Sequence, residues 1–528
     1  MAISKNSGSR FDHPVLVFAL IFASIFLLHV SLLRLPYFWD EAGYYIPAAR
    51  DLLLSGSLIP HSTPSNAHPP LVMIYLALCW KIAGYSSIVT RTAMLAIAAF
   101  SLTGIFRLAQ RISNGEVAVA TVICTALYPV FFSQSSLAHV DLAAAGLIFW
   151  GLLAYIKDRR VAAATWFSLA FFAKETAILI PLALFIWERG CPWLTTNAAL
   201  CLYRRSAWKS AFLLVPLVPL CAWYSFHYLR TRFVFGNPEF FRYNVQATMQ
   251  PVRILLALLL RLWQVFGYFG LFWLTLATLF AMTHRALPED DKSQKERARI
   301  AVNIQVTFLA IIVVYVLALS VVGGAVLARY MLPIVPLVIM ISISTLRRRL
   351  RHWRVIIAIV ALVFVIGLFV NPPYGFSMED NLAYRDYIVL HQGAEKFLKA
   401  RYPSAKVLTA WPANDELTRP YLGYITRPMQ VVRIEDFTAE QLMSATDLSS
   451  RFDVALVFST KYEPRHAMLQ NWRLWTELKT KFFGYHRDVP PAVAAEILGG
   501  HVAYADNRDG QWVAVIEMDR IEEASAQP

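Results

Sequence analysis

Residues 14–33 read PVLVFALIFASIFLLHVSLL, a run of twenty residues without Asp, Glu, Lys or Arg. A helix of roughly 20 apolar residues spans the hydrocarbon core of a membrane. We find eleven such runs, near 14–33, 88–107, 116–133, 139–156, 161–173, 176–188, 208–229, 255–282, 300–321, 328–346 and 353–371. The sequence therefore predicts a mostly α-helical, polytopic transmembrane bundle of about 11 spans, within a range of about 11–13.

The composition of the whole chain agrees with a membrane protein. Of its 528 residues, 57% are hydrophobic and 16% are charged, whereas a soluble domain carries about 25% charged residues. This excludes an ordinary soluble enzyme, a disordered chain and a disulfide-rich secreted protein. Residues 1–371 hold 32 Lys and Arg against 14 Asp and Glu, and residues 372–528 hold 17 against 21. Basic excess in an apolar region is typical of cytoplasmic loops, so no nucleic-acid partner is predicted.

The basic residues also predict the orientation in the membrane. If the N-terminus is cytoplasmic, 21 of those 32 basic residues fall on the cytoplasmic side, including the run from Arg347 to Arg354. An odd number of spans then places residues 372–528 outside. The first span is too long for a typical signal peptide and lacks a small-x-small cleavage site. We therefore expect a multi-pass protein of the inner (plasma) membrane with an extracytoplasmic tail.

Three regions follow from this topology: a transmembrane domain at 1–371, its large first extracytoplasmic loop at 34–87, and the tail at 372–528. Within the loop, 41–54 and 71–82 are too short to span and are expected to lie on the outer membrane face. The tail holds strand-like runs at 406–411, 454–459, 501–505 and 512–517 among helical segments. It predicts a small α/β domain, and it holds none of the five cysteines.

Ionisable residues from six separate segments fall on the predicted outer face. Alone, each has an ordinary explanation, such as a helix N-terminal acid or an interfacial arginine. Together they place acids among cations at one membrane boundary, where charge is costly and usually functional. The set comprises Asp40, Glu41, His61, His68, His139, Asp141, Lys174, Glu175, His227, Arg230, Arg232, Glu239, Arg242, Tyr243, Arg329 and Tyr330.

This combination suits the transfer of a sugar from a lipid phosphate. A carboxylate can take the proton from the acceptor hydroxyl. Lysine and arginine can bind the phosphate and stabilise the charge that develops on it as the bond breaks. No Gly-rich phosphate loop occurs between a strand and a helix, so a nucleotide site has no support.

Five motifs among these residues resemble a known family. They are WDEAGYY at 39–45, HPPL at 68–71, HVD at 139–141, AKET at 173–176 and RYMLP at 329–333. Their order and predicted side are similar to those of the GT-C superfamily of integral-membrane glycosyltransferases, in the branch of the lipid A aminoarabinose transferase and the protein O-mannosyltransferases. The resemblance covers about residues 14–345 and implies a GT-C type bundle.

The resemblance implies an activity: inverting transfer of a hexosyl or pentosyl group from a polyprenyl-phosphate donor to a lipid, glycan or protein acceptor in the cell envelope. It also implies site roles. Asp40 is the general base or orients it, and Glu41 and Asp141 shape the acceptor and sugar side, which makes these three the catalytic candidates. Donor-phosphate contacts fall to Lys174, Arg329 and His68. Substrate binding is assigned to Tyr44, Tyr45, His139, Glu175, Tyr243 and Tyr330.

Two departures from the family pattern limit what it implies. Ala67-His68 stands where the aminoarabinose transferase has Glu-Lys, so a lysine contact is missing or replaced by His68, and aminoarabinose specificity does not carry over. Glu175 replaces a glycine, and the motif gives this acid no role. No cofactor is required by the pattern. A divalent metal is the open alternative, with Asp40, Glu41, Asp141, His68 and His139 as the residue types that could hold it.

Two other classes of function remain open. A transporter or flippase of a lipid-linked or anionic substrate would place its ionisable groups near the midplane and often shows inverted repeats. Here the groups collect at one face and no repeat is visible. A non-catalytic assembly partner with an outer binding domain would leave Asp40 dispensable.

Overall fold

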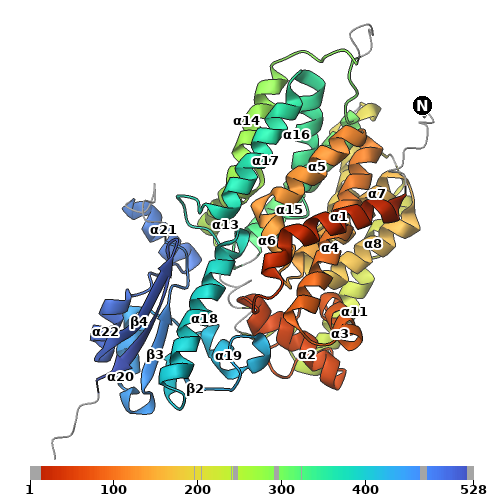
Figure 1. The fold of residues 1–528 in the computed structure, drawn as a ribbon. Helices are drawn as coiled ribbons and strands as arrows, with labels where there is room; N and C mark the ends of the chain where they lie inside the picture. Colours follow the sequence, from red (N-terminus) through yellow and green to blue (C-terminus); the bar gives the residue numbers. More distant parts are fainter. Residues whose placement is uncertain are drawn as a thin grey trace, which may run out of the picture. The chain divides into compact units, whose positions relative to one another are not determined.

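The computed structural model describes residues 13–195, 197–203, 205–238, 241, 248–289, 296–322, 324–463 and 472–519 (Figure 1). The chain divides into two compact units. The first comprises Met1–Leu33 and Pro47–Val370, and the second comprises Arg34–Ile46 and Asn371–Pro528. Thirteen residues near the N-terminus, 34–46, thus cluster with the tail and not with the rest of the predicted first loop.

The first unit is built of helices. Their bounds are α1 (Pro14–His29), α2 (Ile46–Ser55), α3 (Leu71–Ala83), α4 (Ser87–Ile112), α5 (Gly115–Leu127), α6 (Pro129–Gln134), α7 (Asp141–Ile156), α8 (Arg160–Ala173), α9 (Leu179–Leu194), α10 (Ala207–Ser210), α11 (Leu217–Thr231), α13 (Pro251–Phe266), α14 (Leu271–Met282), α15 (Val302–Val321), α16 (Val335–Arg349) and α17 (Trp353–Phe369). Side chains cap the starts of α4 and α5, where Ser86 accepts from the Val89 amide and Asn114 from the Val117 amide.

Six helical stretches are long and apolar enough to cross a membrane, within the described part of the chain. They are Pro14–Leu32, Ser87–Ile112, Glu175–Leu194, Ala207–Thr231, Pro251–Met282 and Val302–Val321. Shorter apolar helices α5, α7, α8 and α17 occupy four further predicted spans. The predicted helical membrane fold is confirmed. The run 255–282 is not one straight helix, because Phe269 and Gly270 adopt positive φ between α13 and α14.

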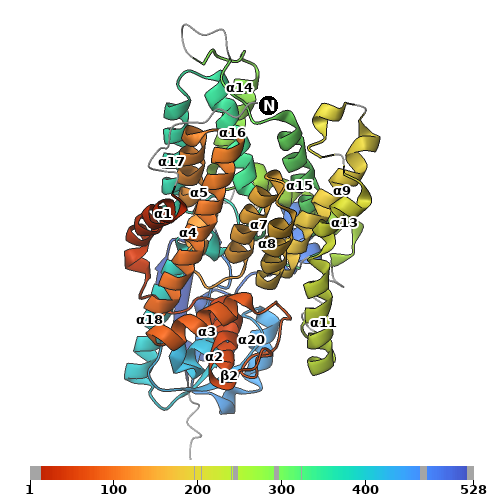
Figure 2. The same ribbon diagram turned by 90° about the vertical axis from the view of Figure 1, so that its right-hand side faces the viewer.

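Small residues let α7 pack closely between two neighbours, as Figure 2 shows for α4, α7 and α8. A Cβ added to Gly146 would lie 2.1 Å from Ser101 Oγ on α4, and one added to Gly151 would lie 2.5 Å from Phe167 Cε1 on α8. Such glycines allow helices to approach closely without the large side chains that water-soluble cores use. The tight packing fixes the first residue of α7, Asp141, relative to the end of α8.

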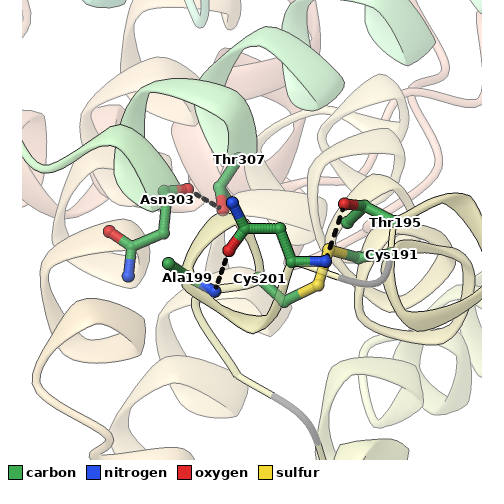
Figure 3. The surroundings of a disulfide bond; sticks show 7 residues. Cys191, Thr195, Ala199, Cys201, Asn303 and Thr307 are labelled. Atoms are coloured by element: carbon green, nitrogen blue, oxygen red, sulfur yellow. Dashed lines mark hydrogen bonds between the residues drawn. A yellow bond between two sulfur atoms is a disulfide. The ribbon is translucent and has the colours of Figure 1, made fainter.

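A disulfide joins Cys191 in the last turn of α9 to Cys201 (Figure 3). The Asn197 side chain accepts a hydrogen bond from the Ala199 amide inside the loop that the disulfide closes. This pairing was not predicted, and the orientation set by the basic residues puts the loop in the cytoplasm, where thiols are normally kept reduced. A disulfide is unexpected if the loop is cytoplasmic, so one experiment can test both the disulfide and the predicted orientation.

The second unit contains a five-stranded mixed sheet in the order β2-β1-β3-β5-β4. Its elements are α18 (Ala383–Arg401), β1 (Lys406–Thr409), α19 (Ala413–Thr418), β2 (Gln430–Arg433), α20 (Ala439–Thr446), β3 (Val454–Phe458), α21 (Arg473–Phe483), α22 (Pro491–Leu498), β4 (Gly500–Arg508) and β5 (Gln511–Met518). β2, β1 and β3 run parallel, and β5 is antiparallel to both β3 and β4. The predicted small α/β tail is confirmed, with β2 as an additional edge strand.

Candidate active site

An acid and two cations meet inside the first unit. Asp141 is the first residue of α7, Lys174 follows the last residue of α8, and Arg329 lies in a 3₁₀ turn at Ala328–Met331. Lys174 forms an ion pair with Asp141, and Arg329 Nε lies 3.4 Å from Asp141 Oδ2. The three residues are 2%, 5% and 2% exposed, respectively. Charges this deeply buried are stable only when paired, so the three side chains form one electrostatic unit.

His139 extends this unit. Its Nδ1 lies 2.8 Å from Gln134 Oε1 and 2.9 Å from Arg329 Nη1. The ring is completely buried, and the charges of Arg329, Arg91 and Lys174 all act on it. Residues two positions apart do not share one face of a helix. Arg329 nevertheless contacts both His139 and Asp141, because His139 precedes α7 and Asp141 is its first residue.

Two further arginines surround the same position. Arg91 on α4 donates to the Ser136 carbonyl at 2.8 Å, and Arg261 on α13 donates to the Leu327 carbonyl at 2.7 Å. Their exposed fractions are 1% and 0%. Arg91, Lys174, Arg261 and Arg329 form what we call the cation cluster.

The Tyr330 ring connects three members of the cation cluster. Lys174 Nζ lies 3.8 Å from the ring centroid, and the Cζ atoms of Arg261 and Arg329 lie 5.4 and 5.7 Å from it. Cations over an aromatic face are attracted by the ring quadrupole, which offsets part of their mutual repulsion. Asp141 pairs with two members of the cluster, Lys174 and Arg329. The cluster thus gathers four cations in a buried part of the first unit, an arrangement that suits an anionic ligand.

A second pair lies next along the chain. Glu175, which follows Lys174, accepts from His68 Nδ1 at 2.8 Å. Glu175 also lines an apolar cavity of about 600 Å³ between the helices that follow it. The other lining side chains come from α9, α11, α15 and the segment after α11, and include Leu179, Leu220, Tyr224, Phe235 and Leu319. Lys174 of the cation cluster is therefore the chain neighbour of Glu175, which lines the apolar cavity.

The Asp-Glu motif is held within the second unit. The Tyr37 amide donates to the Leu422 carbonyl at 3.2 Å, and Trp39 packs edge-on against Trp411 with ring centroids 5.2 Å apart. Glu41 is fully buried and accepts from the Phe38 amide at 2.9 Å.

The backbone of the Asp-Glu motif is unusual. Trp39 has φ of 44°, and residues Glu41–Tyr45 form a single π-helical turn, a geometry common at functional sites. Gly43 allows Trp411 to pack closely against this turn, because a Cβ there would lie 2.6 Å from Trp411 Cζ2. Asp40, by contrast with Glu41, is partly exposed. The motif is thus a constrained segment with one accessible acid.

The structure brings some of the predicted site residues together. Asp141, Lys174, Arg329, His139 and Tyr330 share one cluster, and His68 and Glu175 form a neighbouring pair. Asp40, Glu41, Tyr44 and Tyr45 belong to the second unit, and Tyr243 lies outside the described residues. Arg91 and Arg261 were not predicted. Each is a lone arginine within an apolar helical run, a signal that should have marked both as functional or structural anchors.

Comparisons with known proteins agree with the motif resemblance. The family model described as dolichyl-phosphate-mannose-protein mannosyltransferase matches residues 67–223. No curated protein sequence matches the chain. Among solved structures, ArnT from Cupriavidus metallidurans bound to undecaprenyl phosphate is 14% identical with a TM-score of 0.53, over 95% of this chain and 97% of that one.

Two further structures are similar. The apo form of ArnT is 15% identical with a TM-score of 0.55, over 96% of this chain and 98% of that one. An oligosaccharyltransferase from Archaeoglobus fulgidus in complex with zinc and sulfate is 11% identical over 95% of this chain and 73% of that one, with a TM-score of 0.43. Because that last score is low, only the ArnT structures bear on the fold. The chain is a multi-pass membrane protein that resembles the GT-C superfamily of glycosyltransferases, in the branch of ArnT and the protein mannosyltransferases.

Proposed function

We propose that the protein is an inverting glycosyltransferase that takes a hexosyl or pentosyl group from a polyprenyl-phosphate donor. The observation that carries this proposal is the buried cation cluster, in which Asp141 pairs with Lys174 and Arg329 and which adjoins an apolar cavity. A polyprenyl phosphate combines an anionic group, which the cations would bind, with an apolar chain, which the cavity would accommodate. ArnT, which shares the fold, has been solved with undecaprenyl phosphate bound.

In this proposal the donor phosphate binds Lys174 and Arg329. Both are strong donors to phosphate oxygens, and burial strengthens the interaction because water does not screen it. They would stabilise the negative charge that develops on the leaving phosphate as the sugar–oxygen bond breaks. Asp141 holds the two cations in position before the donor arrives. The apolar cavity beside Glu175 would take the first isoprene units of the lipid.

We assign the acceptor side to the Asp-Glu motif. Asp40 is accessible and would remove the proton from the acceptor hydroxyl, which then attacks the sugar carbon opposite the phosphate. Glu41 is buried and bonded to the backbone, which suits a role in fixing the motif. Tyr44, Tyr45, His139, Glu175, Tyr243, Tyr330 and His68 stay assigned to substrate or donor binding.

The activity is tested by mass spectrometry of envelope glycolipids and glycoproteins from cells with and without the gene. We expect one sugar modification to disappear without the gene, and Asp40→Asn not to restore it. Asp158→Asn is a control because this half-exposed acid lies at the opposite end of α7, and it should restore the modification fully. Identical modifications in both extracts would refute the proposal.

Donor binding is tested separately with undecaprenyl phosphate and purified protein in detergent. Arg329→Ala should weaken binding at least about tenfold, which corresponds to roughly 1.4 kcal/mol. Arg347→Ala is the control, because Arg347 pairs with Glu116 at the far end of α16. If proteoliposomes moved the labelled lipid across the bilayer without any sugar transfer, the transporter alternative would replace the enzyme.

We also propose the orientation that the basic residues predict, with a cytoplasmic N-terminus and residues 372–528 outside the inner membrane. An epitope added after Pro528 should then be accessible to antibody in spheroplasts, in which the outer face of the inner membrane is exposed. An epitope before Met1 should be accessible only after the membrane is permeabilised. Labelling of the N-terminal epitope in intact spheroplasts would reverse the assignment.

A further inference from the structure

Three ionisable side chains meet in the interior of the second unit and take no part in the function proposed above. His391 and Glu395 lie one turn apart on α18, and Glu416 lies on α19. Each is at most 1% exposed. One candidate ligand atom from each residue lies within 4.8 Å of the other two. We call these three residues the His391 cluster.

The hydrogen bonding of the cluster leaves several strong acceptors facing inward. His391 Nδ1 lies 2.6 Å from Glu416 Oε2. A proton lies between these two atoms at this distance. Within the described residues, His391 Nε2, Glu416 Oε1 and both carboxylate oxygens of Glu395 are buried without a hydrogen-bond partner. Four buried polar atoms without a partner on three adjacent side chains are far outside the usual behaviour of protein interiors.

The charge of the cluster is also unbalanced. Neither Glu395 nor Glu416 forms an ion pair with a lysine or arginine in the described part of the chain. Such a site is stable only if it takes up positive charge. A proton on Glu395 would supply one donor, whereas a cation could engage all three residues at once.

The walls of the cluster are rigid. The His391 ring stacks on Tyr387 with centroids 3.9 Å apart and meets Phe458 of β3 at 4.6 Å. Tyr387 in turn packs against Phe38 and Trp39, with centroid distances of 5.2 and 5.7 Å. The aromatic rings fix the imidazole plane, as a preorganised metal site requires. They also connect the cluster to the segment that carries the Asp-Glu motif.

We propose that His391, Glu395 and Glu416 bind one divalent transition-metal ion, with Zn²⁺ as the best match. Two carboxylates balance a double positive charge. Imidazole with carboxylates suits zinc and its neighbours in the first transition row, whereas Ca²⁺ and Mg²⁺ prefer sites made of oxygen alone. In the metal-free geometry His391 Nδ1 lies 2.6 Å from Glu416 Oε2 with a proton between them, and the ion would replace that proton so that Nδ1 and the two carboxylates coordinate it. The ion would join α18 to α19. It would thereby hold Tyr387 in place, which packs against Phe38 and Trp39 of the segment 34–46.

The test uses the full-length protein in detergent, stripped of metal by a chelator, dialysed and titrated with Zn²⁺. Elemental analysis should find about one zinc per wild-type chain, and Co²⁺ in place of Zn²⁺ should give a visible absorption band. Glu395→Gln and His391→Gln should each weaken zinc binding at least tenfold. Asp415→Asn, next to Glu416 on α19, and Asp40→Asn, in the proposed active site, should keep wild-type affinity.

Stability provides the second measurement. Chelation should lower the unfolding temperature of the wild type, and Zn²⁺ should restore it. Glu395→Leu replaces the carboxylate with an apolar side chain that suits a buried position, so this variant should fold but lose both zinc and the response to chelator. The proposal is overturned if the wild type holds no zinc, if the ligand variants bind it as tightly as the wild type, or if chelation leaves wild-type stability unchanged.

Discussion

Asp141 is expected to compete with the donor phosphate for the same two cations. It is 2% exposed, pairs with Lys174, and has Oδ2 3.4 Å from Arg329 Nε. Asp141→Asn removes the negative charge while keeping the shape of the side chain. Removal of one partner from a buried ion pair costs about 3–5 kcal/mol, because the remaining charge is left uncompensated. We expect the lower end of that range, since the asparagine carbonyl can still accept a hydrogen bond.

The same substitution should strengthen phosphate binding. An anionic headgroup would neutralise the cations that Asn leaves unpaired and would no longer be repelled by Asp141. We expect undecaprenyl phosphate to bind about tenfold more tightly, which corresponds to roughly 1.4 kcal/mol. The thermal stability lost by the variant should therefore be partly recovered when this lipid is added. Unfolding temperatures and a lipid titration, both in detergent, measure the two effects.

Glu188→Gln provides the matched control. Glu188 lies in the second half of α9, is 1% exposed and pairs with Arg205 at 2.6 Å. This variant should lose similar stability, but undecaprenyl phosphate should not restore it. Competition between Asp141 and the donor phosphate is refuted if Asp141→Asn binds the lipid no more tightly than the wild type, or if both variants recover equally.

The remaining predictions concern packing and orientation. Gly43→Ala should destabilise the second unit by about 1–3 kcal/mol through overpacking against Trp411, measured as a lower unfolding temperature. Gly375→Ala, where an added Cβ meets no atom within 4 Å, should have little effect, and equal losses would contradict the packing argument. Both cysteines of the disulfide are buried, so cells are quenched with acid and alkylated in denaturant. If the predicted orientation holds, this treatment should modify both Cys191 and Cys201, whereas protein purified without reductant should contain the disulfide. A pair that resists alkylation in cells would indicate that this loop lies outside the cytoplasm.

The membrane helices were predictable because hydropathy is a local property of the sequence. The break in the run 255–282 was not, since it depends on positive φ at Phe269 and Gly270 and on packing around them. Edge strand β2 was missed because it is four residues long and incompletely buried, which gives a weak pattern. The four strands that were predicted include β3, where every residue is buried.

Site residues were predictable where they stand at the ends of helices within recognisable motifs, as Asp141, Lys174 and Arg329 do. Their common neighbours Arg91 and Arg261 were missed because they lie inside apolar helices, where position along the sequence does not show which side chains they approach. The His391 cluster shows a different limit. The spacing of His391 and Glu395 is visible in the sequence, but the approach of Glu416 depends on how α19 folds back onto α18. Tertiary packing alone creates that group.

Because residues 34–46 belong to the second unit, the order of synthesis determines when the Asp-Glu motif can fold. The Asp-Glu motif is translated before most of the membrane helices, whereas Tyr387, Trp411 and Leu422, which pack around it and its flanking residues, are translated after them. The motif therefore lacks its packing partners while the intervening helices insert. A chain terminated before these partners would carry the proposed general base on an unsupported segment.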